Sequence, residues 1–173
     1  MRNTGLVENK VWRPSFKLSQ GFTPIELLIV IAIISILVAT ALPSFLDRIE
    51  REKLRSASEL LRAELKWAKT EAVRTNQKIV ADFTNGINGS WSFTFSPVVP
   101  VKVIAGSNYS DFSAISLKSS FVGSSTFFEP VRGKARAGSV VFSSTNFSLD
   151  VRVSVLGRVR ICSTTGFTGI EPC

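Results

Sequence analysis

The chain has 173 residues, of which 45% are hydrophobic, and it contains 21 Lys and Arg, 13 Asp and Glu and no His. That length leaves room for one membrane-rooted helix and one small domain. The absence of His excludes His-dependent catalytic triads, most zinc sites and imidazole acid–base chemistry. The glycines are scattered and form no phosphate-binding loop. The composition therefore predicts no catalytic residues, no metal site and no cofactor, and the protein is not expected to be an enzyme.

A basic leader precedes a long apolar run. Residues 22–42 number 21, or about 31 Å as a helix, close to a bilayer core of roughly 30 Å. A secretory signal has its cleavage site after the apolar region, whereas Gly21 comes before it. Cleavage after Gly21 would therefore leave the membrane segment on the mature protein. The leader has four basic residues and one acid, which predicts a cytoplasmic leader and an outward-facing C-terminus: Arg2, Lys10, Arg13, Lys17 and Glu8.

Glu26 lies one turn inside the apolar run. A carboxylate there is costly without a partner, which makes it a candidate functional residue. Cleavage after Gly21 creates an α-amino group on Phe22, four residues away. The two groups could pair between staggered helices and set an axial step. The alternative is a plain signal anchor that tolerates an acid near its end.

The sequence GFTPIELLIVIAIISILVATAL at residues 21–42 resembles the N-terminus of type IV pilins and of type II secretion pseudopilins. The resemblance implies that residues 1–21 are a prepilin leader, that a prepilin peptidase cuts between Gly21 and Phe22, and that the new Phe22 amine is methylated. It also implies a single-pass protein of the bacterial inner membrane with a periplasmic domain. Its partners would be other pilins or pseudopilins in a filament, with residues 22–42 in the filament core.

Pro43 ends the apolar run and predicts a kink or local melting of the helix. Residues 43–76 then predict an amphipathic helix, with Glu50 and Leu54 off its apolar stripe. The opposite, charged face is interpreted as solvated helix surface with weak ion pairs. The stripe consists of residues spaced by three, four or eight positions: Leu46, Ile49, Ala57, Leu61, Leu65, Ala68 and Ala72.

Residues 77–173 predict a β-rich domain. Six segments favour strands, at 79–83, 91–95, 101–105, 139–143, 149–155 and 158–162. The loop-rich stretch 105–138 could add one or two more, around 114–117 and 120–122. Turns are indicated at 85–86, 88–89, 97, 100 and 106. We therefore expect an α+β, type IV pilin-like fold, in which a long N-terminal helix packs on a C-terminal antiparallel sheet.

Two further segments resemble the GspH/FimT family of minor pilins and pseudopilins. They are WAKTEAVRTNQKIV at residues 67–80 and VRVSVLGRVRIC at 151–162, whose Gly157, Arg158, Val159 and Arg160 match the family's GRxR element. The resemblance covers about 19–78 and 139–162, and residues 82–138 are not matched. It implies a minor pilin or pseudopilin, and some FimT-type pilins bind DNA through GRxR during natural transformation. An unrelated, membrane-anchored binding protein is a distant alternative.

The charge distribution points to the same part of the chain. Four of the 21 basic and one of the 13 acidic residues lie in the leader, so 17 and 12 remain. The whole excess of five lies in residues 131–160, since Asp150 is their only acid. Arg158 and Arg160 would share one strand face, with Val159 and Ile161 facing the core. The basic residues of this stretch are Arg132, Lys134, Arg136, Arg152, Arg158 and Arg160.

This pattern predicts binding of double-stranded DNA through its phosphates, without sequence specificity. Arg158 and Arg160 would make the contacts, joined by Arg132, Lys134 and Arg136 if that loop lies near. The alternative is a basic surface that pairs with an acidic neighbouring subunit or keeps the domain soluble, as in a type II secretion pseudopilin without DNA binding.

Cys162 and Cys173 are the only cysteines. Both lie in the domain expected outside the cytoplasm, where disulfides persist. A bond between them would close a short loop and hold the C-terminal tail beside the Arg158–Arg160 segment. Two free thiols are the alternative, and two cysteines without His do not favour a metal site.

Overall fold

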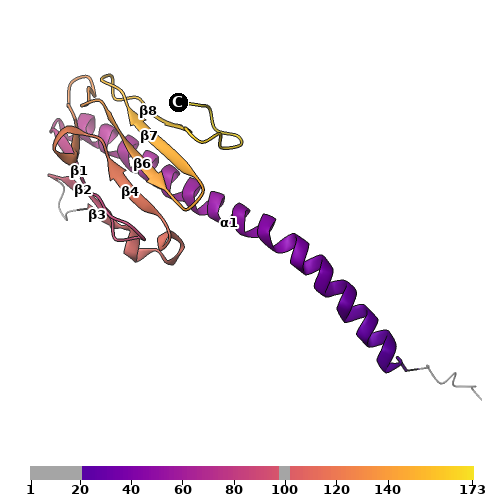
Figure 1. Cartoon of the computed structure of the whole chain (residues 1–173). Coiled ribbons are helices and arrows are strands. Elements are labelled where there is room, and N and C mark those ends of the chain that lie inside the picture. The colour runs from indigo at the N-terminus through magenta and orange to yellow at the C-terminus, as the bar shows by residue number, and fades with distance from the viewer. Residues whose placement is uncertain (1–20, 98–101) are drawn as a thin grey trace, which may run out of the picture. The chain divides into compact units, whose positions relative to one another are not determined.

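The computed structural model of the protein describes residues 21–97 and 102–173 (Figure 1). The chain divides into two compact units, of which the first ends at Ala41 and the second comprises Leu42–Cys173. A single helix, α1 (Pro24–Thr75), contributes to both units. Residues 1–20 of the expected leader and the turn predicted at Pro100 lie outside the described residues.

Local signals explain both ends of α1. Thr23 is the N-cap, because its Oγ1 accepts a hydrogen bond from the Glu26 N–H at 3.3 Å, and Pro24 occupies the first helical position. At the other end Asn76 has a φ of 51°, the left-handed conformation that ends many helices. The helix was expected from about Phe22, and it starts two residues later. It is uninterrupted at Pro43, so the backbone does not melt there, and a bend at this residue stays a prediction.

Apart from Glu26, Ser35 and Thr40, the N-terminal section of α1 is apolar on all sides, and the side chains from Phe22 to Leu42 are exposed. By length and composition α1 is the one helix of the described chain that could span a membrane. A helix that is apolar all round needs an apolar environment, which is either lipid or neighbouring helices.

The section of α1 in the second unit buries one face. Leu54 is fully buried, although the sequence placed it off the stripe; it lies three residues before Ala57 and continues the same face. Leu46 and Ile49 were expected in the stripe but are 57% and 36% exposed, because they precede the part of the helix that the sheets cover. The buried face consists of Leu54, Ala57, Leu61, Leu65, Ala68 and Ala72.

Two four-stranded antiparallel sheets pack with this face of α1 (Figure 1). Sheet A has the order β3-β2-β1-β5, and sheet B has the order β4-β6-β7-β8. The strands of sheet A are β1 (Ile79–Thr84), β2 (Ser92–Ser96), β3 (Lys102–Ala105) and β5 (Ser125–Phe128). Those of sheet B are β4 (Ser116–Ser119), β6 (Gly138–Ser143), β7 (Ser148–Val153) and β8 (Val159–Cys162). The α+β class and the antiparallel pairing are confirmed, but the single sheet that was expected is two.

The unmatched middle of the chain contains the main errors of the strand prediction. The strand expected at 114–117 is β4, shifted to Ser116–Ser119, whereas the one expected at 120–122 is wrong. Residues 120–121 belong to no strand, and a 3₁₀ turn, η3 (Val122–Ser124), follows with φ of 70° at Gly123 and 50° at Ser124; β5 was missed. Two more 3₁₀ turns, η1 (Gly106–Asn108) and η2 (Ser110–Phe112), precede β4.

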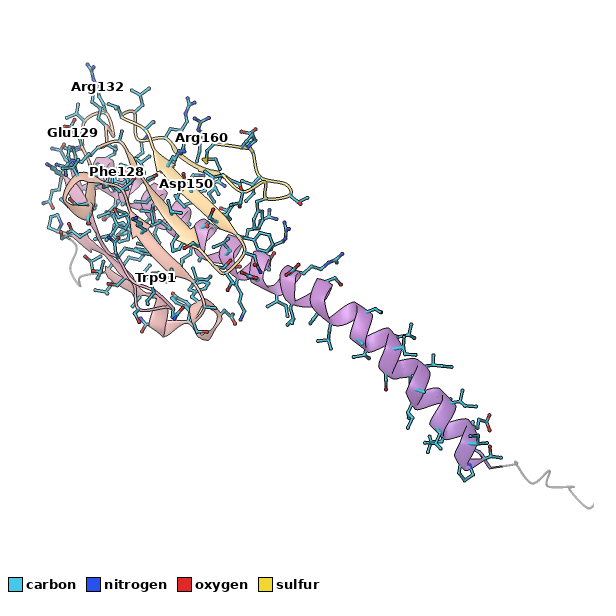
Figure 2. All side chains as sticks on the ribbon, viewed as in Figure 1. Trp91, Phe128, Glu129, Arg132, Asp150 and Arg160 are labelled. Carbon is cyan, nitrogen blue, oxygen red and sulfur yellow. A yellow bond between two sulfur atoms is a disulfide. The ribbon has the colours of Figure 1, made fainter. Side chains whose placement is uncertain are left out.

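Aromatic side chains join the two sheets into one core. Trp91 is 1% exposed, and its ring lies 6.1 Å from Phe93 of sheet A and 5.3 Å from Phe142 of sheet B. Its indole N–H donates to the Ile115 carbonyl at 2.9 Å, so the buried polar atom is satisfied. Figure 2 shows Trp91 and Phe128 inside the domain. Sheet B therefore packs one face on this core and leaves the other face exposed.

Candidate functional site

The N-terminal segment presents the residues expected for processing. Gly21 and Phe22 precede the first turn of α1 and are exposed, and Glu26 lies in that first turn. Thr23 and Glu26 stand at the spacing of a capping box, a signal that the sequence interpretation missed. Cleavage after Gly21, methylation of Phe22 and pairing of Glu26 involve other molecules and stay predictions.

Three arginines gather on the outer face of sheet B. Arg152 of β7 and Arg160 of β8 are directly opposite each other in the antiparallel register. Arg158, immediately before β8, lines the same open hollow as these two. All three are exposed, whereas Val159 between them is 6% exposed and points into the core. Ile161 is half-buried rather than fully in the core. The hollow also carries serines at positions 120, 139 and 154.

The turn that leads into β8 is held tightly. Gly157 has a φ of 67°, and a Cβ at this position would meet the Gly133 carbonyl oxygen at 2.1 Å, so only glycine fits. The Arg158 N–H donates to the Ser154 hydroxyl at 3.1 Å. Lys69 of α1 donates from Nζ to the Leu156 and Gly157 carbonyls, both at 3.1 Å. The helix thus fixes the turn that positions Arg158.

The loop between β5 and β6 packs against this turn, as the Ala135 N–H donates to the Val155 carbonyl at 2.9 Å. Arg132 and Lys134 are exposed on the loop. Figure 2 shows Arg132 pointing away from the domain. Arg136, the third predicted residue of the loop, has other contacts. Its Nη1 donates to the Val122 carbonyl at 3.0 Å, and its guanidinium lies 5.2 Å from the centroid of the Phe127 ring.

The C-terminal tail covers part of the same sheet. Cys162 and Cys173 form the expected disulfide, which Figure 2 shows near Arg160. Asp150 of β7 is 7% exposed beside it and accepts a hydrogen bond from Arg152 at 3.1 Å. Although the ligand atoms of Asp150 and the two cysteines lie within 4.8 Å of one another, the disulfide leaves no thiolate for a metal.

Glu50 of α1 is a carboxylate with a shifted pKa. Burial works to raise the pKa of Glu50, but hydrogen bonds outweigh it and hold the pKa below its ordinary value. The Asn146 N–H donates to this carboxylate at 2.9 Å and the Asn146 side-chain amide at 3.1 Å. These bonds tie α1 to the turn between β6 and β7, away from the arginine hollow.

Residues 57–157 match the family model described as type II transport protein GspH. The chain belongs to this family. Residues 16–42 also match the prokaryotic N-terminal methylation motif. The GspH family and this motif together place the protein among the pilins and pseudopilins that are anchored by an apolar N-terminal helix and assemble into filaments after processing by prepilin peptidase.

A solved structure of type IV minor pilin FimU from Pseudomonas aeruginosa shares the fold. One crystal form has a TM-score of 0.52 at 18% identity and covers 70% of this chain and 96% of FimU. A second form has a TM-score of 0.48 at 17% identity, covering 68% and 98%. No curated protein sequence matches the chain. The expected resemblance to GspH/FimT-type minor pilins is confirmed.

Two residues that the structure places at the arginine hollow or at the turn beside it, Arg152 and Lys69, were not selected from the sequence. Arg152 was counted in the basic stretch but not selected, although β7 precedes β8 and an antiparallel pairing across the Gly157 turn would have placed it opposite Arg160. Lys69 was interpreted as part of the charged, solvated face of the helix. Its hydrogen-bond acceptor, the Leu156 carbonyl, lies 87 residues away in the sequence. No local pattern indicates so distant a hydrogen bond.

Proposed function

We propose that this GspH-family subunit is a minor pilin of a type IV filament, and that it binds extracellular DNA for uptake through the outer face of sheet B. The observation that carries the proposal is the convergence of Arg152, Arg158 and Arg160 on one open hollow. The domain would stand on the periplasmic side of the membrane before assembly.

The electrostatics of the face favour an anionic ligand. Like charges directly opposite in an antiparallel pair are destabilising, and Arg152 and Arg160 are such a pair. Asp150 offsets part of this charge through its contact with Arg152. A guanidinium presents a planar fork of donors that suits phosphate oxygens, and the serine hydroxyls around the hollow add neutral donors.

Arg132 and Lys134 extend the charge over the neighbouring loop, because that loop packs on the turn before β8. Arg136 is left out of the proposed contact set, since the Val122 carbonyl and the Phe127 ring already engage its guanidinium. The proposed contacts are all to the backbone of the duplex, so binding would be independent of sequence and strongly dependent on salt.

The DNA proposal is tested by titrating labelled duplexes of two unrelated sequences with the full chain in an uncharged detergent. Arg158→Gln/Arg160→Gln should weaken binding to both duplexes alike, and each lost phosphate contact should lower the salt slope by about 0.9. Arg74→Gln/Lys78→Gln removes the same charge at the end of α1 and just before β1, outside the hollow, and is the charge control; because Arg74 pairs with Glu71 and Lys78 lies over the Phe127 ring, circular dichroism must confirm that it folds. Unchanged affinity in a folded Arg158/Arg160 variant would show that these residues are not the site.

We further propose that prepilin peptidase cuts after Gly21, that Phe22 is N-methylated, and that Glu26 pairs with the Phe22 amine of an adjacent subunit. Pairing would offset the burial of both charges in the filament core. The intact mass of membrane-extracted protein checks processing, and a mature chain that retains residues 1–21 rules it out. Glu26→Ala should insert into the membrane but fail to enter sheared filaments, whereas Glu52→Ala, on the exposed part of α1, should enter normally.

The second candidate is a minor pseudopilin of a type II secretion system, which the description of the matched family favours. It predicts no DNA affinity of the wild-type chain near physiological salt and a protein-export defect on deletion. Neighbouring genes for pilus assembly or for secretion would separate the two candidates at little effort.

A further inference from the structure

A second group of arginines lies on α1, outside the site described above. Arg48, Arg51 and Arg55 are spaced by three and four residues, which places them on one face of the helix. This section of α1 belongs to the same compact unit as the two sheets. Among the residues that the structure describes, none of these three arginines takes part in an ion pair, whereas Arg62 on the same helix pairs with Glu59 at 3.0 Å.

Arg51 anchors this helix face to the C-terminal tail. Its guanidinium lies 4.0 Å from the centroid of the Phe147 ring and 5.5 Å from that of Phe167. Phe167 belongs to the loop closed by the disulfide between Cys162 and Cys173. Arg51 is therefore occupied in packing, and it fixes the part of the helix that carries Arg48 and Arg55.

The helix arginines adjoin the proposed DNA site. Arg55 and Arg160 line one hollow between α1 and β8, together with Ile170 of the tail. Arg55 also lines the next hollow along the helix, with Arg48 and Arg51. Arg160 in turn lines the hollow that contains Arg152 and Arg158. Neighbouring hollows that share Arg160 and Arg55 thus form a continuous path from the outer face of sheet B to α1.

We propose that Arg48 and Arg55 form a second row of phosphate contacts, which extends the DNA-binding face from sheet B across the disulfide loop onto α1. This proposal depends on the proposed function, because it lengthens the same binding surface. Arg48 and Arg55 are seven residues apart, or about 10 Å along the helix, enough to reach a phosphate beyond those at the sheet. Glu52, Glu59 and Glu171 lie along the path and reduce its charge. Duplex DNA fits the surface because it is an extended polyanion that can follow all three hollows.

The test compares three variants of the full chain in an uncharged detergent. Arg48→Gln/Arg55→Gln removes the helix row and spares Arg51, since Arg51 packs on two rings; Gln is a good helix former. Arg158→Gln/Arg160→Gln removes the sheet contacts, and Arg74→Gln/Lys78→Gln is the matched loss of charge elsewhere. Duplex affinity is measured over a range of salt concentrations, with circular dichroism to confirm folding. Native mass spectrometry of the detergent-solubilised chain with added phosphatidylcholine or phosphatidylglycerol reports binding to anionic lipid.

The helix variant is expected to lower the salt slope by about 1.8, or about 0.9 for each of two contacts, and the matched control to leave it unchanged. A helix variant with the wild-type slope overturns this proposal, and if the sheet variant is impaired in the same series the proposed function stands. A wild-type chain with no DNA affinity overturns both. A helix variant that binds DNA normally but loses a wild-type preference for phosphatidylglycerol over phosphatidylcholine also overturns the proposal and assigns the row to lipid.

Discussion

Sheet A and sheet B share one core, but the cations on the two sheets differ in whether other residues of the domain already contact them. Beside sheet A, two cations have structural contacts: Lys102 of β3 pairs with Glu64 at 2.6 Å, and Lys78, just before β1, lies 3.9 Å from the Phe127 ring centroid. On sheet B, Arg158 and Arg160 take part in no ion pair of the described chain, and Arg152 is exposed although it contacts Asp150. A site is therefore located by which cations remain available, not by how many a segment contains.

The same contrast explains why Arg136 and Arg160 differ although both come from the basic stretch. Arg136 follows the loop after β5, where a carbonyl and an aromatic ring of the sheet A side engage it. Arg160 stands on β8, the edge strand of sheet B, with no neighbouring strand beyond it in the described sheet. Its side chain is exposed on the outer face of sheet B, where a large ligand can reach it.

The largest effect is expected where the two sheets depend on each other. Trp91→Ala removes the ring between Phe93 and Phe142 and should destabilise the whole domain by about 3–5 kcal/mol. Urea unfolding of the full chain, followed by circular dichroism, measures the loss. Ile87→Ala is the control, since Ile87 is 70% exposed and should change little. A loss confined to one sheet would contradict the single core.

Loss of the disulfide should have a smaller effect on stability, and this effect should be larger in sheet B than in sheet A. Cys162→Ser/Cys173→Ser opens the loop of the tail and should reduce stability by about 2–3 kcal/mol on the chain-entropy model. Because the tail covers sheet B, amide exchange should accelerate in β8 before it does in sheet A. The reduced wild-type chain should behave like the variant. Equal acceleration of amide exchange in β1 and β8 would contradict the expectation that the tail stabilises sheet B more than sheet A.

Lys69→Met tests whether α1 positions the turn before β8. The variant loses two hydrogen bonds from a charged, partly exposed group and should be destabilised by about 1–2 kcal/mol. The amides of residues 154–157 should exchange faster, and DNA affinity should fall less than in Arg158→Gln/Arg160→Gln. Lys66→Met, one turn earlier and exposed, is the control. An unchanged turn would show that the packing of Gly133 on Gly157 is sufficient.

The smallest effect concerns Glu50, which lies outside the arginine path. Its pKa is lowered in the folded state, so its contribution to stability is complete above the ordinary value of 4.5 and is lost as the pH falls below it. Glu50→Gln should therefore cost up to about 1 kcal/mol at neutral pH and be less acid-sensitive than the wild type. Unfolding midpoints between neutral and acidic pH measure this, with Glu52→Gln as control. A parallel pH profile in both variants would disprove the role of the Asn146 contacts.

The sequence was sufficient to predict features that depend on a repeating pattern or on residues at fixed spacings. The prepilin-like segment, the amphipathic helix and the strands with alternating side chains are local patterns, and they gave the fold class and most of the strands. The division into two sheets was not predictable, because it depends on β5 pairing with β1 while β6 pairs with β4. Leu54 was wrongly placed off the buried face of the helix, because the predicted apolar stripe was drawn through Leu46 and Ile49, which the structure leaves exposed. Lys69 and Arg152 depend on tertiary contacts and register, which no local pattern shows.

The contrast between the two sheets can be measured directly by placing a photo-crosslinking amino acid on each. Val155, in the turn before β8, is 60% exposed, and Val103, on β3 of sheet A, is 53% exposed, so the two sites are matched in residue type and accessibility. After irradiation with a labelled duplex, the full chain carrying the probe at Val155 should crosslink to DNA, with a yield that falls steeply as salt rises, while the probe at Val103 should give background yield. Equal yields at the two sites, or crosslinking at Val103 alone, would contradict a DNA-binding face on sheet B.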